Sequence, residues 1–238
     1  MKNLSFLILF SIVFLSCDED INPITFEVEE FNNTYEADIS VVLERAEESN
    51  EIGKRINNKV TDTIIAIISE EAEENLKAVL SNFNKDYLEF KREFLEDERP
   101  WTLNIESEVT YQSPEIITIA LNTYIDKGGA HGNDVIQFLN FDPKTGKLFK
   151  QSEIIKNQND FKALAENYLK KSMQSKTIED EPSEDFFFGK PFQLPENIGF
   201  SDDGLILLYN VYEIASYHQG FTEFAIPFDI VEPYLNVR

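Results

Sequence analysis

The chain has 238 residues, and its 44 Asp and Glu residues outnumber its 21 Lys and Arg residues, which gives a formal net charge of −23 at pH 7. Binding to nucleic-acid phosphates or adsorption on anionic membranes requires clustered positive charge, so this balance excludes general binders of either kind. Hydrophobic residues make up 42% and aromatic residues 13% of the chain, enough for a core in one compact unit or in two small subdomains that share one.

Cysteine and histidine are scarce, and this limits the chemistry. Cys17 is the only cysteine, so the chain forms neither an intrachain disulfide nor a thiolate metal cluster. His131 and His218 are the only histidines, which excludes a zinc site with three histidine ligands. We therefore expect no metal and no cofactor.

Residues 1–16 have the pattern of a lipoprotein signal peptide. Lys2 supplies a positive start, and an uncharged apolar run from Leu4 to Leu15 follows it. At about 12 residues the run is too short to span the ~30 Å of membrane hydrocarbon, but it suits a signal peptide. The end of the run, Phe14-Leu15-Ser16-Cys17, resembles a bacterial lipobox, in which the cysteine is diacylated. The alternative is a buried core strand, which would not end in a run of acidic residues.

Cys17 thus predicts a lipid anchor in a membrane, followed by an acidic tether over residues 17–25. Asp18-Glu19-Asp20 resembles the export tag of surface lipoproteins in Bacteroidota-like bacteria, and a merely solvated tether is the alternative. We expect an outer-membrane lipoprotein exposed on the cell surface, with a periplasm-facing orientation as the alternative. After the signal the chain keeps 20 basic and all 44 acidic residues, a side-chain charge of −24.

The first structural elements are predicted to be a hairpin and a long helical stretch. Residues 24–31 alternate apolar and acidic side chains, and residues 35–43 supply the partner strand. From Ile52 to Phe94, apolar residues recur every three or four positions, which indicates an amphipathic helix with an acidic solvated face. Unbroken, such a helix would be about 60 Å long, so we expect a break near residues 69–71 or 81–82.

From Pro100 onwards the apolar period becomes two, which is typical of strands. Strands are predicted at 101–111, 115–125, 135–141, 197–200, 205–212 and 221–226. An amphipathic helix is expected over 160–173, with Asn159 or Asp160 as its N-cap, and a short helix from Pro227 to Leu235. Residues 177–185 form an acidic loop. These elements predict an α+β fold in which an antiparallel sheet packs against long amphipathic helices, as two intimately associated subdomains.

The segment from Lys127 to Gly132 is the most unusual part of the sequence. Gly128, Gly129 and Gly132 lie within five positions and surround His131. Glycines allow positive φ angles and a close approach of another group, which suits a ligand-facing loop. A structural glycine corner with a packed histidine explains the same residues.

Glu213, Tyr217 and His218 form a second candidate ligand-binding segment. A pair between Glu213 and His131 across the sheet would be suited to general base catalysis or to a buried structural hydrogen bond. Acids such as Asp134 would allow the histidines to hold a divalent ion, although nothing in the spacing selects one. No Gly-x-Ser-x-Gly motif is present, so we assign no catalytic residue.

Several segments together resemble the PdaC/RsiV-like extracytoplasmic domains, a family of domains of unknown function. They are Pro100-Trp101, GGAHG at 128–132, LNFD at 139–142, Thr145-Gly146, LPENIGFSDDGLILLYNVYEI at 194–214 and EFAIPF at 223–228. The resemblance implies a PdaC-like N-terminal module at 26–112 and an RsiV-like C-terminal module at 113–238. In that family, one branch is the ectodomain of an anti-sigma factor that binds lysozyme, and another precedes a peptidoglycan deacetylase domain. We expect neither an anti-sigma segment nor a deacetylase domain in this chain.

The sequence therefore predicts an envelope binding or sensing module rather than an enzyme. Its expected ligand is a cell-wall glycan or a cationic protein such as lysozyme, which strong negative charge would attract. The alternatives are a glycan-modifying enzyme that uses a His131–carboxylate pair and a structural or assembly protein of the envelope. The oligomeric state is left open.

Overall fold

The computed structural model describes residues 23–31, 34–70, 72–95, 99–176 and 186–238. The predicted signal peptide and Cys17 lie outside the described residues, as do most of the predicted tether and the acidic loop at 177–185. None of the described helices is both long and apolar enough to cross a membrane.

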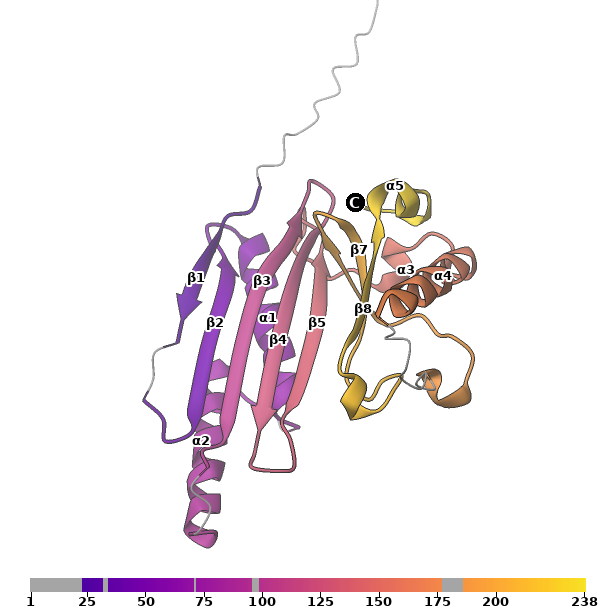
Figure 1. Cartoon of the computed structure of the whole chain (residues 1–238). Coiled ribbons are helices and arrows are strands. Elements are labelled where there is room, and N and C mark those ends of the chain that lie inside the picture. Colours follow the sequence, from indigo (N-terminus) through magenta and orange to yellow (C-terminus); the bar gives the residue numbers. More distant parts are fainter. Residues whose placement is uncertain (1–22, 32–33, 71, 96–98, 177–185) are drawn as a thin grey trace, which may run out of the picture.

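The described chain forms two sheets flanked by helices, an α+β fold as predicted (Figure 1). The first sheet has the order β1-β2-β3-β4-β5, with strands Phe26–Glu30, Asp38–Ala46, Thr102–Gln112, Ile117–Asp126 and Asn133–Phe141. The second has the order β6-β7-β8, with strands Asn197–Ser201, Gly204–Tyr209 and Thr222–Pro227. The helices are α1 (Glu51–Ile68), α2 (Leu76–Glu93), α3 (Gln151–Ile154), α4 (Gln158–Lys176) and α5 (Phe228–Val231).

The strand pairing differs from the prediction in two respects. The expected hairpin β1–β2 forms, but β2 pairs in parallel with β3, starting with Asp38 opposite Thr102. A parallel pair requires a crossover connection, which the helices α1 and α2 supply between β2 and β3. The predicted strands also form two sheets rather than one. In the described structure, no ladder of backbone hydrogen bonds joins β5 to β6.

The long helical stretch is interrupted, as its length required. Helix α1 ends before Ser69, whose N–H still donates to the Ile65 carbonyl at 2.9 Å, and α2 begins after Asn75. The Asn75 side chain accepts a hydrogen bond from the Ala78 N–H, a typical N-cap. The break lies at the first of the two predicted positions. It folds both helices back over the same face of the first sheet.

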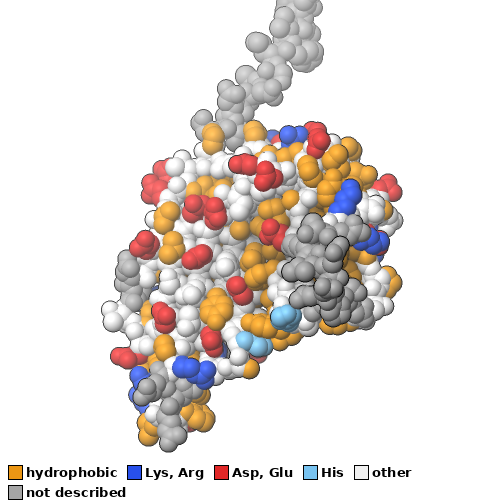
Figure 2. Space-filling view, viewed as in Figure 1, with side chains coloured by type: hydrophobic (Ala, Val, Ile, Leu, Met, Phe, Trp, Pro, Cys, Tyr) orange, Lys and Arg blue, Asp and Glu red, His pale blue; other side chains and the backbone are white. Residues whose placement is uncertain are grey.

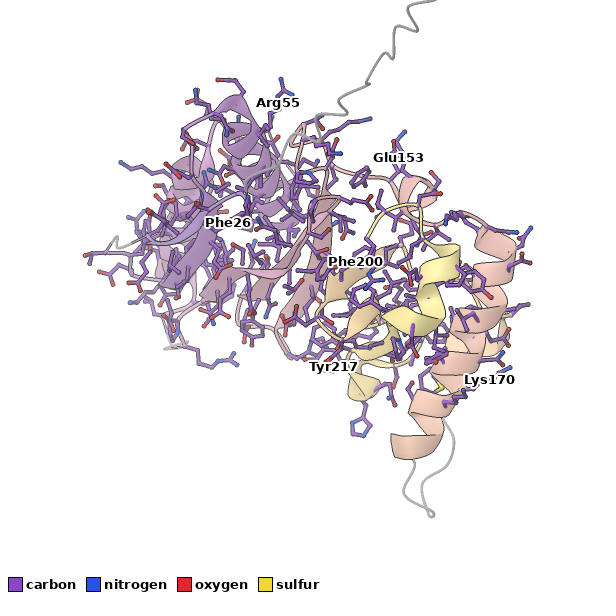
Figure 3. The ribbon with its side chains drawn as sticks, turned by 90° about the horizontal axis from the view of Figure 1, so that it is seen from above. Phe26, Arg55, Glu153, Lys170, Phe200 and Tyr217 are labelled. Atoms are coloured by element: carbon purple, nitrogen blue, oxygen red, sulfur yellow. The ribbon has the colours of Figure 1, made fainter. Side chains whose placement is uncertain are left out.

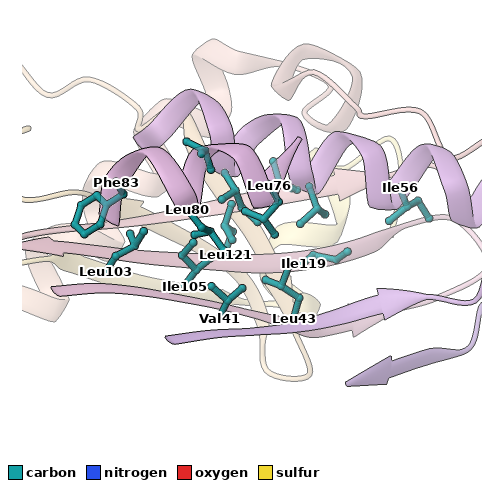
Figure 4. Packing of buried hydrophobic residues seen from close by; sticks show 14 of the residues in the cluster. Val41, Leu43, Ile56, Leu76, Leu80, Phe83, Leu103, Ile105, Ile119 and Leu121 are labelled. Carbon is teal, nitrogen blue, oxygen red and sulfur yellow. The ribbon is translucent and has the colours of Figure 1, made fainter. Parts of the chain in front are cut away.

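The first core fills the space between these helices and the five-stranded sheet (Figure 4). Alternate side chains of β3 point toward the helices, among them Leu103 and Ile105, and both are fully buried. They meet Leu80 from α2 and Ile56 and Ile64 from α1, which are also fully buried. No helix of the described residues covers the opposite face of this sheet (Figure 1).

The second core lies between the three-stranded sheet and α4, beside the five-stranded sheet (Figure 3). Phe161, Ala165 and Leu169 recur at four-residue spacing along α4 and are buried there. The predicted N-cap, Asn159 or Asp160, lies two or three residues too late: the Asn157 side chain accepts from the N–H groups of Asn159 and Asp160 at 3.2 and 3.4 Å. Residues 158 onwards are therefore helical.

Two asparagines join the second sheet to the outer edge of β5. Asn210 accepts from the Ile136 N–H at 2.9 Å and donates to the Ile136 carbonyl at 3.0 Å. Asn197 accepts from the Phe138 N–H and donates to the Ile136 carbonyl, both at 2.8 Å. Side-chain amides thus satisfy edge groups that a further strand would otherwise pair.

Close packing accompanies these hydrogen bonds. Gly199 lies so near Phe138 that a Cβ atom at this position would come within 2.4 Å of the ring. The Thr110 hydroxyl donates to the Phe200 carbonyl at 2.7 Å, and Asn140 donates to the Ile198 carbonyl at 2.8 Å. The two sheets therefore form a continuous unit, with contacts from β3 and β5 to β6.

Candidate functional site

The open face of the five-stranded sheet presents acidic side chains. Strand alternation turns Leu103, Ile105 and Ser107 into the core and leaves Glu106 and Glu108 exposed on the other face. Figure 2 shows acidic side chains scattered among hydrophobic ones over this face, while most of the basic side chains visible in this view lie near its margins. We call this surface the acidic face.

A groove with a volume of about 530 Å³ runs along the acidic face and reaches the second sheet. Its lining combines carboxylates with apolar side chains and holds neither Lys nor Arg. The lining residues are Val28, Val42, Glu44, Glu106, Ser107, Glu108, Thr110, Ala120, Asn122, Ile136, Phe138, Ile206 and Glu223. Apolar and negatively charged lining together suit a ligand that has both an apolar surface and positive charge.

The four carboxylates of the groove are not equivalent. Glu44 accepts the Val109 N–H at 2.6 Å, and its own N–H donates to the Ser107 hydroxyl at 3.0 Å, so it is fixed in the sheet. This contact lies beside an irregularity of the β3–β4 pairing between Val109 and Tyr111, a feature that frees ladder groups. The carboxylates of Glu106, Glu108 and Glu223 have no hydrogen bond or ion pair with any described residue, and these three side chains are available to a ligand.

The glycine-rich segment forms the connection between β4 and β5. Gly128 has a φ of 77°, donates its N–H to Asp126 at 2.8 Å, and accepts from Arg99 at its carbonyl. At Gly132 a Cβ atom would come within 2.3 Å of the Tyr124 hydroxyl, so a larger residue there would require the Tyr124 ring to move. Gly129 is exposed and meets no such restriction. The local structure thus favours glycine at two of these positions, Gly128 and Gly132.

His131 lies exposed at this corner and contacts two tyrosines from the segment between β7 and β8. Its ring stacks on Tyr217 with centroids 3.7 Å apart and an interplanar angle of 18°. Its Nδ1 lies 3.1 Å from the Gly132 carbonyl, and its Nε2 lies 3.1 Å from the Tyr212 hydroxyl. The structure therefore brings together His131, Gly132 and Tyr217, and it adds Tyr212, which sequence reasoning did not select.

The expected pair between Glu213 and His131 does not form. Glu213 instead accepts the Asn210 N–H at 2.8 Å and closes the turn after β7. Partial enclosure by the surrounding protein raises the pKa of Glu213, against the opposing effect of the Asn210 N–H. Among the described residues, neither histidine has an ion pair with a carboxylate, and His218 lies exposed in a short 3₁₀ turn. The Glu213 carboxylate does not pair with His131 because it is hydrogen-bonded within the turn after β7.

The carboxyl group of Asp134 is partly buried. Burial raises the pKa of its carboxyl group, and one of its oxygens is buried without a hydrogen-bond partner in the described structure. No cluster of three or more His, Cys, Asp and Glu side chains among the described residues is arranged to hold a metal ion. Two candidate binding surfaces thus stand out on the described residues: the acidic groove, and the exposed rings of His131, Tyr212 and Tyr217.

Comparison with protein families accounts for both halves of the chain. Residues 28–134 match the model described as deacetylase PdaC, and residues 147–229 match DUF3298, a protein of unknown function. The chain is a two-module protein of the PdaC/DUF3298 type. This confirms the resemblance seen in the sequence. No curated protein matches the chain. Whether the modules divide after residue 112 stays a prediction.

Solved structures share the fold of this PdaC/DUF3298-type protein. A DUF3298 family member from Bacteroides fragilis is 22% identical with a TM-score of 0.66, over 90% of this chain and 94% of that one. A DUF3298 family protein from Pseudomonas aeruginosa is 20% identical with a TM-score of 0.65, over 91% of this chain and 96% of that one. Both similarities concern the fold.

Proposed function

We propose that this PdaC/DUF3298-type protein is a lipid-anchored binding module of the cell envelope that captures a cationic protein on its acidic face. The observation that carries the proposal is the groove of about 530 Å³ with the uncompensated carboxylates of Glu106, Glu108 and Glu223. Basic side chains of a partner would complete the ion pairs that these residues lack. The apolar lining residues, including Ile136 and Phe138, would cover apolar parts of the same partner.

Long-range charge supports the same partner class. The chain as a whole carries a net charge of −23, and such a field accelerates encounter with cations and repels anionic partners. No observation on the described residues favours the glycan-modifying enzyme, since its His131–carboxylate pair does not form. Capture and sensing of a basic protein require only a surface of this kind.

Binding of lysozyme, a strongly basic protein, tests the proposal. We expect the immobilised chain to bind lysozyme at about 20 mM salt and to bind it more weakly at about 150 mM, where the Debye length falls to ~8 Å. Lysozyme with acetylated lysines is the matched control, because it keeps its shape and loses most of its positive charge. Absence of binding at low salt, or equal binding of both forms, would contradict the proposal.

Membrane attachment through Cys17 is the second part of the proposal. We expect a fatty-acid analogue supplied to the producing cells to label the wild-type protein, and Cys17→Ala to abolish the label and the membrane attachment. A labelled Cys17→Ala variant would show that the anchor lies elsewhere. Protease added to intact cells is expected to remove the domain from the cell surface. Survival of the domain would indicate that it faces the periplasm.

A further inference from the structure

Three aromatic rings form an exposed cluster between the β4–β5 connection of the first sheet and the β7–β8 connection of the second. They belong to His131, between β4 and β5, and to Tyr212 and Tyr217, between β7 and β8; we call them the aromatic platform. The His131 and Tyr217 rings stack in parallel, and Tyr212 lies at 39–41° to both, with centroids 5.5 and 6.2 Å away. Side chains of both histidines are visible at the lower margin of the molecule in Figure 2, beside hydrophobic side chains.

Hydrogen bonds fix the orientation of the rings. The Gly132 carbonyl only accepts hydrogen bonds, so Nδ1 of His131 carries the proton that is donated to it. In the neutral ring Nε2 is then an acceptor, and the Tyr212 hydroxyl donates to it at 3.1 Å. The Tyr217 hydroxyl donates to the same Gly132 carbonyl at 3.3 Å. The platform is thus organised before any ligand arrives.

Tyr212 occupies a backbone conformation that the side chain itself disfavours. Its φ of 68° lies in the left-handed region, where non-glycine residues are uncommon and strained. Burial does not offset this strain, because the residue is 54% exposed, and Tyr217 is 38% exposed. Strain combined with exposure is typical of residues held in place for contact with another molecule.

We infer that the aromatic platform is a carbohydrate-binding site that takes a pyranose ring of a glycan. The C–H groups on one face of a pyranose are weakly positive and match the negative face of an aromatic ring. The hydroxyls around the same sugar find the phenol oxygens and the imidazole at the rim of the platform. Among the described residues, no carboxylate is hydrogen-bonded or ion-paired to the three rings.

The aromatic platform is distinct from the acidic face. Its rings are absent from the lining of the acidic groove, and its ligand needs no positive charge. The glycan site and the capture of a basic protein therefore succeed or fail separately. Together they would allow the protein to hold a glycan while it binds a cationic protein.

Titration calorimetry with chitotetraose and cellotetraose tests the glycan site on the full chain. We expect at least one of the two uncharged tetrasaccharides to bind saturably, and Tyr212→Gly to weaken that binding by about tenfold or more, as for loss of one stacked ring. Glycine suits the φ of 68° at this position, so the variant is expected to fold. Tyr217→Leu is expected to weaken binding similarly.

Phe94→Ala is the matched control, because Phe94 is 53% exposed and lies at the end of α2. It is expected to leave glycan binding unchanged. The inference is overturned if neither saccharide binds at millimolar concentration, or if Tyr212→Gly binds as well as the wild type. It is also overturned if Phe94→Ala loses as much affinity as Tyr212→Gly. Tetralysine is titrated as a cationic probe; if it alone binds, and its binding depends on Tyr212, the platform is a cation site and the inference is likewise overturned.

Discussion

Replacing Asn197 and Asn210 together by alanine is expected to lower the free energy of unfolding by about 3–5 kcal/mol. The double variant leaves the Ile136 N–H, the Ile136 carbonyl and the Phe138 N–H without their side-chain partners. Each partly buried backbone group without a partner costs about 1–3 kcal/mol. Urea denaturation followed by circular dichroism measures the change.

The two single variants provide an internal test of this link. Both asparagines donate to the same Ile136 carbonyl, so we expect each single variant to lose about 1–2 kcal/mol and the pair to be non-additive. Asn58→Ala, at an exposed position of α1, is the control and is expected to change stability by less than about 0.5 kcal/mol. Single variants as stable as this control would show that other contacts join the two sheets.

The triple variant Glu106→Gln, Glu108→Gln, Glu223→Gln is expected to weaken lysozyme binding about 10- to 100-fold at low salt. Exposed ion pairs contribute at most about 1 kcal/mol each, and three of them together account for this range. Glutamine keeps the shape of each side chain and removes only its charge. The loss should shrink as salt is added, because screening weakens the wild-type complex as well.

The triple variant also lowers the net negative charge of the whole chain, which by itself could weaken binding. A second triple variant therefore serves as the control. This control removes the same charge from exposed positions of α1 and α2, on the helix-covered side of the five-stranded sheet, and carries Asp62→Asn, Asp86→Asn and Glu93→Gln. We expect this control to retain most of the affinity. Equal losses in both triple variants would mean that the partner responds to overall charge and does not dock on the acidic face.

The elements of the fold were largely predictable because they depend on local patterns. The four-residue apolar spacing of α1 and the acidic–apolar alternation of β1 are visible in the sequence. The parallel pairing of β2 with β3 was not, since it depends on where α1 and α2 return the chain. The role of Asn197 and Asn210 was equally hidden, because it arises from contacts 59–74 residues apart.

The candidate site was predictable only in part. The alternation around Glu106 and Glu108 was recognised as a strand pattern, but the groove also needs Glu223, more than 100 residues away in the chain. His131 and Tyr217 were selected from the glycine-rich segment and its partner loop. Tyr212 was missed, since its positive φ becomes visible only in the structure.

Methyl-resolved NMR of the lysozyme complex tests the central claim, capture on the acidic face, most directly. Ala120, Ile136 and Ile206 line the groove, whereas Ala66 is exposed on α1. We expect the methyl signals of the three groove residues to shift or broaden on addition of lysozyme, while the Ala66 signal stays unchanged. Shifts confined to Ala66 and other helical positions, with an unperturbed groove, would contradict the proposed binding surface.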